Sequence, residues 1–71
     1  MLQLNDYVEV KISKCVSDYE YSLTLEAIGE YLGNKRYIKE IVKDDIYPRY
    51  RLDTIDDMLF YGDELVKMEG K

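Results

Sequence analysis

The side chains best suited to chemistry in this sequence are its carboxylates. Asp53, Asp56 and Asp57 lie close enough in the chain to offer several oxygen ligands to a hard cation. The segment nevertheless lacks the glycine and the terminal glutamate of the helix–loop–helix calcium site. The pairs Asp44-Asp45 and Asp56-Asp57 are more typical of turns, in which an aspartate accepts hydrogen bonds from nearby backbone amides. We therefore expect no metal site and no bound cofactor.

The sequence cannot supply the usual pair of a catalytic nucleophile and a histidine base. The 71 residues include no His and one Cys, so neither a Ser-His-Asp or Cys-His arrangement nor an imidazole or thiolate zinc site can be assembled. The chain also has no glycine-rich phosphate-binding loop. Cys15 has no histidine to activate it and no cysteine to pair with, so we expect it to be a small core residue. These absences predict a protein that is not an enzyme.

The charged residues are segregated along the chain. The net charge is −5, from 15 acidic and 10 basic residues. Residues 1–34 carry two bases and six acids, residues 35–51 carry six bases and three acids, and residues 52–71 carry two bases and six acids. In one interpretation, the basic strip 35–51 pairs with acidic residues of neighbouring strands. In the other, the protein presents two functional faces of opposite sign.

Length and composition predict one small domain over residues 1–71. Apolar residues make up 46% of the chain, but eight of them are tyrosines, which favour core edges and interfaces because the hydroxyl needs a partner. A domain of this size buries only about 60% of its unfolded surface, so a homodimer interface would add stability. No apolar run is near the length of about 20 residues that a membrane-spanning helix needs. Because the first residues also lack the pattern of a secretory signal, we expect a cytoplasmic protein with no membrane partner.

The hydrophobic pattern predicts a mainly β fold. Val8, Val10 and Ile12 alternate with polar residues over 7–12, as in a half-buried strand. In the same way, alternation over 46–52 places Pro48, Tyr50 and Leu52 on one face. Further strands are expected at 36–42, 58–61 and 66–68, with turns at 43–45 and 53–57 and a helical turn at 62–65.

The stretch between the first two strands is harder to interpret. Residues 14–23 are polar and rich in tyrosine, which favours a long loop or a weak strand pair. A short helix is predicted over 24–33, with Thr24 as its N-cap and Gly33-Asn34 at its end. The interior Gly29 weakens this helix by roughly 1 kcal/mol.

Several different short motifs follow one another in the second half of the chain. They are Tyr37-Ile38-Lys39-Glu40-Ile41, Asp45-Ile46-Tyr47-Pro48, Tyr50, Leu52, Asp53, Phe60 and Asp63-Glu64-Leu65. This series resembles the Src-homology-3-like small barrels, in which a Tyr-Pro pair begins a hairpin and an F-x-x-x-E-L segment turns into the closing strand. Residues 4–10 are similar to the opening strand of that family. The resemblance implies a five-stranded Src-homology-3-like barrel with one short helix or helical turn, of the type that phages and prophages often encode.

The chain departs from that family in two places. Asn5 stands where glycine is usual, and residues 24–34 are longer and more helical than the family's loop. The chain has no Trp, so the recognition of PxxP peptides by the signalling members is not carried over.

Residues 23–41 also resemble a helix-turn-helix with Lys35, Arg36 and Lys39 on its recognition helix, although the rest of the chain indicates strands.

The leading hypothesis is a non-enzymatic protein-binding module, a small phage-type regulator or inhibitor of a host protein such as a DNA-processing protein. Its acidic face would mimic DNA and occupy a basic channel, with tyrosines between the acids. The residues expected to bind this partner are Asp6, Glu9, Asp18, Tyr19, Glu20, Tyr21, Asp53, Asp56 and Asp57. In the simpler interpretation, these acids only keep a small protein soluble.

Two other functions remain open from the sequence. The first is a small nucleic-acid-binding domain that uses Lys35, Arg36, Lys39, Arg49 and Arg51. The net charge of −5 disfavours it, because the surface as a whole repels phosphates. The second is a structural subunit that assembles with itself through exposed strand edges.

Overall fold

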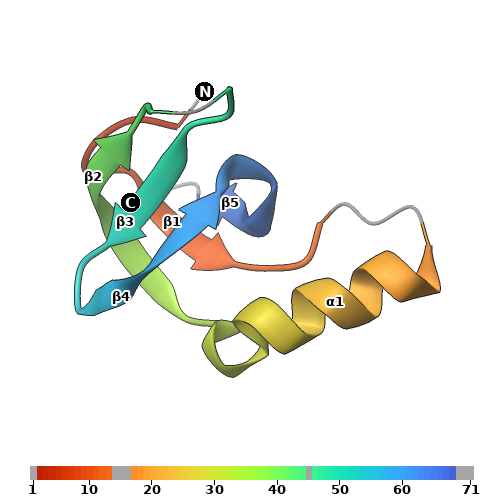
Figure 1. The fold of residues 1–71 in the computed structure, drawn as a ribbon. Helices are drawn as coiled ribbons and strands as arrows, with labels where there is room; N and C mark the ends of the chain where they lie inside the picture. Colours follow the sequence, from red (N-terminus) through yellow and green to blue (C-terminus); the bar gives the residue numbers. More distant parts are fainter. Residues whose placement is uncertain (1, 14–16, 45, 69–71) are drawn as a thin grey trace.

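The computed structural model describes residues 2–13, 17–44 and 46–68 (Figure 1). Within these residues, five antiparallel strands form one sheet in the order β4-β3-β2-β1-β5, accompanied by one α-helix and two short 3₁₀ turns. The strands are β1 (Tyr7–Val10), β2 (Lys35–Val42), β3 (Arg49–Leu52), β4 (Ile55–Tyr61) and β5 (Leu65–Lys67). The helix is α1 (Asp18–Ile28), and the 3₁₀ turns are Gly29–Tyr31 and Gly62–Glu64. The expectation of a mainly β fold is confirmed.

Strand β2 connects the two halves of the sheet. Its first residues, from Lys35 to Tyr37, pair with β1, and its later residues, from Ile38 to Val42, pair with β3. The register shifts between Ile38 and Glu40. A shift of this kind bends a strand and increases its twist, so one long strand can serve both halves. Figure 1 shows β2 crossing behind β3 and β4 to reach β1.

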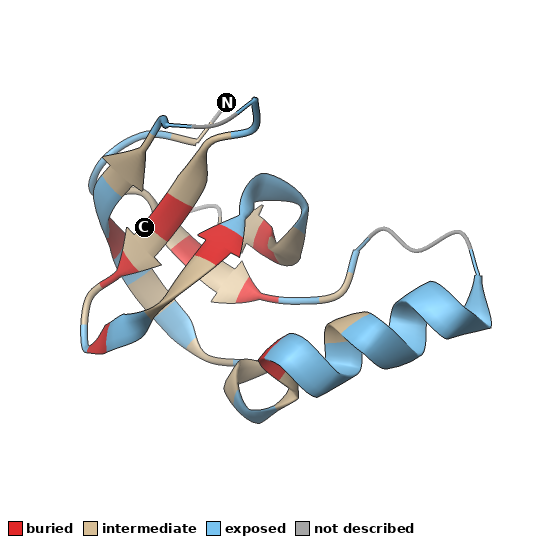
Figure 2. Cartoon of the chain, in the orientation of Figure 1, coloured by how far each residue is buried: buried red, intermediate tan, exposed pale blue. Residues whose placement is uncertain are grey.

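The core lies where the alternating residues of the strands meet. Val8 and Val10 are buried as predicted, and Ile12 follows β1 as a half-buried residue against the same core. Tyr50 and Leu52 are buried on one face of β3, which confirms the alternation expected there. Pro48 precedes β3, where its missing N–H removes no ladder bond. In Figure 2 the buried residues lie on the strands and at the C-terminal end of α1, whereas most of α1 is exposed.

The predicted turn at 53–57 is wrong in its second half. Leu52 pairs directly with Ile55, so the turn contains only Asp53 and Thr54. Thr54 has a φ of 64°, in the left-handed region, and the Asp53 Oδ1 accepts a hydrogen bond of 3.0 Å from the Tyr37 amide. These features reverse the chain within two residues, and Ile55 is buried as the first residue of β4. Asp56 and Asp57 are therefore strand residues.

The largest correction concerns residues 14–23, of which 14–16 lie outside the described residues. A loop or strand pair was expected, but α1 begins at Asp18. The Ser17 Oγ caps the helix by accepting a hydrogen bond of 3.1 Å from the Glu20 amide, and Asp18 and Glu20 lie in the first turn, where the helix dipole favours acids. The apolar residues of this segment recur every second position, which is a strand period, so the pattern did not indicate a helix.

The helix predicted at 24–33 is confirmed only in part. Thr24 lies inside α1 and does not cap it, and α1 ends at Ile28, where the chain tightens into the first 3₁₀ turn. Gly33 has a φ of 85° and directs the chain into β2, in agreement with its predicted position after the helix.

Two predictions for the second half of the chain, the strand at 36–42 and the helical turn at 62–65, are confirmed. The strand expected at 36–42 is β2, which excludes the recognition helix of a helix-turn-helix at Lys35, Arg36 and Lys39. The helical turn expected at 62–65 is the 3₁₀ turn Gly62–Glu64, and the closing strand begins at Leu65. Among the described residues, no helix is both long and apolar enough to cross a membrane.

Candidate functional site

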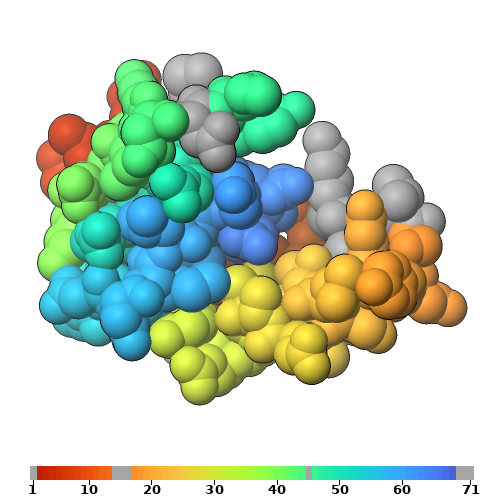
Figure 3. All heavy atoms as spheres, in the orientation of Figure 1, coloured from red at the N-terminus to blue at the C-terminus, as the bar shows by residue number. Residues whose placement is uncertain are grey.

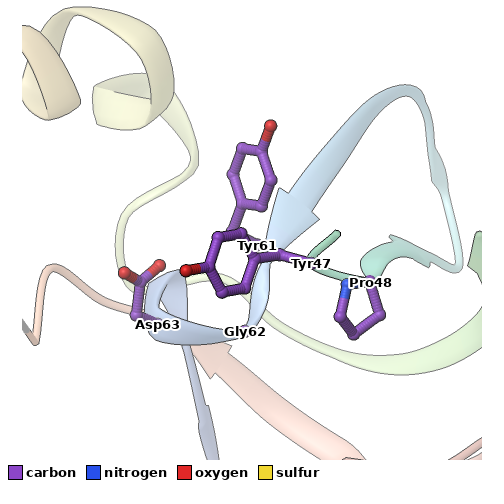
Figure 4. Close-up of a pocket in the computed structure, with 5 residues that line it drawn as sticks. All are labelled: Tyr47, Pro48, Tyr61, Gly62 and Asp63. Atoms are coloured by element: carbon purple, nitrogen blue, oxygen red, sulfur yellow. The ribbon is translucent and has the colours of Figure 1, made fainter. Parts of the chain in front are cut away.

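Two tyrosines line a groove where β3 and β4 meet the second 3₁₀ turn. This tyrosine groove has a volume of about 440 Å³, and its walls are formed by Tyr47, Pro48, Tyr61, Gly62 and Asp63. Tyr47 is 69% exposed and Tyr61 is 42% exposed, so both rings are accessible to a ligand. Figure 4 shows the two tyrosine side chains between Pro48 on one side and the Asp63 carboxylate on the other.

Strand pairing brings these residues together from separate parts of the chain. Arg49 pairs with Tyr61 across β3 and β4, which places Tyr47 and Pro48 next to the end of β4. Hydrogen bonds hold the 3₁₀ turn in position. The Tyr61 amide donates to Glu64 Oε1 at 2.9 Å, the Lys11 amide donates to the Glu64 carbonyl at 3.0 Å, and the Ser13 hydroxyl donates to the Asp63 carbonyl at 2.7 Å. The groove is therefore attached to the chain segment that follows β1.

A second hollow adjoins the tyrosine groove on the side of α1. This helix hollow has a volume of about 310 Å³. It is lined by Ile12, Glu20, Leu23, Thr24, Tyr61, Asp63 and Glu64. Tyr61 and Asp63 line both spaces, so the two hollows meet at these residues. Together they form a surface that is partly apolar and partly acidic.

The electrostatics of the two hollows favour a cation. Among the described residues that line them, Glu20, Asp63 and Glu64 are acidic, and there is no Lys or Arg. Burial raises the pKa of the Glu64 carboxyl, the hydrogen bond from the Tyr61 amide opposes this rise, and the charge of Asp63 adds to it. Ionised Glu64 is thus partly desolvated next to a second carboxylate, and a bound cation would relieve that cost.

This environment predicts how Glu64 affects the pH dependence of stability. The folded-state pKa lies above the usual 4.5, so the neutral carboxyl favours the folded state, and this contribution declines as the pH rises through that value. We expect Glu64→Gln, which can still accept the Tyr61 amide, to match the wild type at low pH. By pH 7 it should be more stable by at most about 0.5 kcal/mol, because solvent screens a half-buried group. Urea denaturation from pH 3 to 7, with exposed Glu26→Gln as control, measures the difference, and a constant difference across this range would contradict it.

The structure separates the nine residues predicted to bind a partner. Asp18, Tyr19, Glu20 and Tyr21 occupy the first turn of α1, whereas the β3–β4 turn lies at the opposite side of the molecule (Figure 1). That turn and the start of β4 hold Asp53, Asp56 and Asp57, and β1 and the turn before it hold Asp6 and Glu9. Of the nine, Glu20 alone lines either hollow among the described residues.

Several of these acids already have partners within the protein. Asp53 accepts a hydrogen bond from the Tyr37 amide, and Asp6 accepts one of 2.9 Å from the Gln3 amide and lies 3.7 Å from the Lys67 ammonium. Asp56 pairs with Lys39, whose hydrogen bond and charge lower the pKa of the Asp56 carboxyl. These acids do not form one continuous face.

Three of the six bases in the strip 35–51 pair with carboxylates. Arg49 Nη2 lies 2.9 Å from Asp44 Oδ1, and Arg51 Nε lies 2.7 Å from Glu40 Oε1. In addition to the Lys39–Asp56 pair, Arg36 Nε donates to the Thr54 hydroxyl at 2.8 Å. These contacts favour internal neutralisation of the strip over a free phosphate-binding face. Lys35, by contrast, is exposed at the start of β2.

The residues of the tyrosine groove were not recognised from the sequence as a site. Tyr47-Pro48 and Asp63-Glu64 were interpreted as fold motifs, and the sequence contains no sign that they meet in space. No protein-family model, curated protein or solved structure matches this chain, so its function is inferred from the geometry of this site.

Proposed function

We propose that this protein is a non-enzymatic protein-binding module, and that its tyrosine groove takes an extended basic segment of a partner protein. The observation that carries the proposal is the combination of two accessible tyrosine rings with the Asp63 carboxylate in one groove. The adjoining helix hollow adds Glu20 and Glu64, and no Lys or Arg is among the described residues that line either space. An Arg side chain can stack on a tyrosine ring while its guanidinium bonds to a carboxylate. Tyrosine is also a residue type that protein interfaces favour.

The proposal includes a regulatory role. A partner segment rich in Lys and Arg is one that could also contact nucleic-acid phosphates. When the groove binds that segment, it would compete with nucleic acid for the partner, as expected of a small inhibitor of a DNA-processing protein. Competition of this kind requires the acids near the groove and does not depend on Asp53 or Asp56, which are bonded elsewhere.

We also assign the fold to the Src-homology-3-like barrels as part of this proposal. Three features support this assignment: the strand order, the bent β2 that pairs in both halves of the sheet, and the 3₁₀ turn before the closing strand. Asn5, the departure from the family's glycine, has a φ of 73°, a left-handed conformation that Asn adopts more readily than most residues. The fold alone does not imply the ligand, which is argued from the groove.

A labelled peptide of alternating arginine and glycine tests the proposal. Such a peptide stays extended, because its glycines disfavour a helix. We expect saturable binding by fluorescence anisotropy, weakening as salt increases. Tyr47→Ser should weaken binding at least about fivefold, since a cation–π contact contributes roughly 1 kcal/mol.

The matched control is Tyr19→Ser, because Tyr19 is 74% exposed and lines neither hollow. It should bind the peptide as the wild type does. A peptide in which glutamate replaces arginine should not bind. Equal affinity of Tyr47→Ser and the wild type would refute the groove as the binding site.

A further inference from the structure

Helix α1 extends beyond the sheet and leaves most of its apolar stripe uncovered. Tyr21, Leu25 and Ile28 are spaced by four and three residues, so they lie on one side of the helix. Ile28 is completely buried, but Leu25 is 42% exposed and Tyr21 is 47% exposed. The stripe therefore begins in the core and continues past it. Figures 1 and 3 show α1, coloured orange to yellow, as a ridge whose N-terminal end lies away from the sheet.

This stripe is distinct from the two hollows. The helix hollow uses Glu20, Leu23 and Thr24 of α1, and neither Tyr21 nor Leu25 lines it. On an α-helix, Leu23 and Leu25 are about 160° apart, as expected for two residues at 100° per residue. A ligand in the hollows would therefore leave the Tyr21–Leu25 edge of the helix uncovered.

The charge of the surrounding segment limits what can cover this edge. Residues 17–34 contain Asp18, Glu20, Glu26 and Glu30 and no Lys or Arg. Asp18 precedes Leu25 by seven residues, two helical turns, so it lies on the same side as the stripe. A second copy of α1 packed there would bring together two segments with four acids each. A helix that carries Lys and Arg beside its apolar residues would be complementary.

From these observations we infer that the Tyr21–Leu25 edge of α1 is a second docking surface, which receives a basic amphipathic helix of a partner protein. The partner helix would cover the uncovered part of the stripe with its own apolar residues and place its cations next to Asp18. An 11-residue helix is marginal in isolation, so such a contact would also stabilise α1 itself. The inference concerns a surface other than the tyrosine groove and does not require that the groove bind anything.

The probe is a 14-residue peptide of leucine and lysine with a helical period and a single tryptophan. Because this protein contains no Trp, tryptophan emission reports the peptide alone. We expect saturable binding with a shift of the emission to shorter wavelength. The double variant Tyr21→Gln/Leu25→Gln should weaken binding by about tenfold or more, since it removes two apolar contacts. Glutamine is close to leucine in helix propensity, so α1 should persist, which circular dichroism verifies.

Tyr19→Gln is the control on the same helix, because Tyr19 is about 160° from Tyr21 around the axis. It should bind as the wild type does, and so should Tyr47→Ser, which separates this surface from the groove. Three results would overturn the inference. They are no binding by the wild type, equal binding of a leucine–glutamate peptide, and a loss of binding in Tyr47→Ser but not in the double variant. Analytical sedimentation can give a fourth such result. A wild-type dimer that becomes a monomer in the double variant would identify a second copy of the chain as the occupant.

Discussion

Phe60→Ala is expected to remove a large fraction of the free energy of unfolding of this protein. Phe60 is completely buried, and its side chain is the largest fully buried one in the part of the chain that the structure describes. It pairs with Tyr50 across β3 and β4, and its ring makes a T-shaped contact with the ring of Tyr31 at a centroid distance of 5.7 Å. Its removal leaves a cavity that β4, β3 and the first 3₁₀ turn all border. Substitutions of this kind cost about 3–5 kcal/mol.

That loss is large for a chain of this length. Domains have a free energy of unfolding of roughly 0.05–0.15 kcal/mol per residue, so about 4–11 kcal/mol is expected here. Urea denaturation followed by circular dichroism measures the change. Phe60→Leu, which retains most of the volume, should lose much less, and exposed Tyr19→Ala should stay within about 0.5 kcal/mol of the wild type. An unchanged urea midpoint in Phe60→Ala would mean that β4 does not pack as described.

Ile28→Ala is expected to release α1 from the sheet. Ile28 is the one buried residue of α1, and the rest of the helix is exposed or half-buried. Replacement of a buried isoleucine by alanine costs about 2–5 kcal/mol. Because the other α1 contacts with the core are few, this loss should fall mainly on the helix, whereas the strands retain their pairing.

Hydrogen exchange of individual amides distinguishes this local effect from general unfolding. In Ile28→Ala, the amides of 21–28 should exchange faster by at least about tenfold, and those of β2 and β3 should change less. Glu26→Ala, an exposed substitution in the same helix, should leave the exchange of α1 nearly unchanged. Equal loss of protection in the helix and in the strands would show that α1 and the sheet unfold as one unit.

Strands β1 and β3 could be predicted because each carries its signal locally. Val8 and Val10 on β1, and Tyr50 and Leu52 on β3, alternate with polar residues because one face of the sheet is buried and the other is not. The 3₁₀ turn at Gly62–Glu64 was likewise evident from its Gly and acids. Helix α1 was missed in its first half because most of its residues do not face a core. Exposed positions carry no burial pattern, and the local signals available were the cap at Ser17 and the acids of the first turn.

The tyrosine groove was not predictable from the sequence. Tyr47 and Tyr61 come from separate segments, and only the pairing of Arg49 with Tyr61 places them beside each other. The pairing of Lys39 with Asp56, 17 residues apart, likewise follows from the way β2, β3 and β4 lie side by side.

The sequence by itself therefore determined the mainly β class, the faces of the alternating strands, and the segregation of charge. Each of these depends on neighbours within a few residues, where the side-chain period and the turn chemistry operate. The tertiary structure decided which charges pair, how far α1 extends beyond the sheet, and that two tyrosines and the Asp63 carboxylate share one groove. These features depend on strand register and on the path of the chain between strands, which are set by the packing of the whole core.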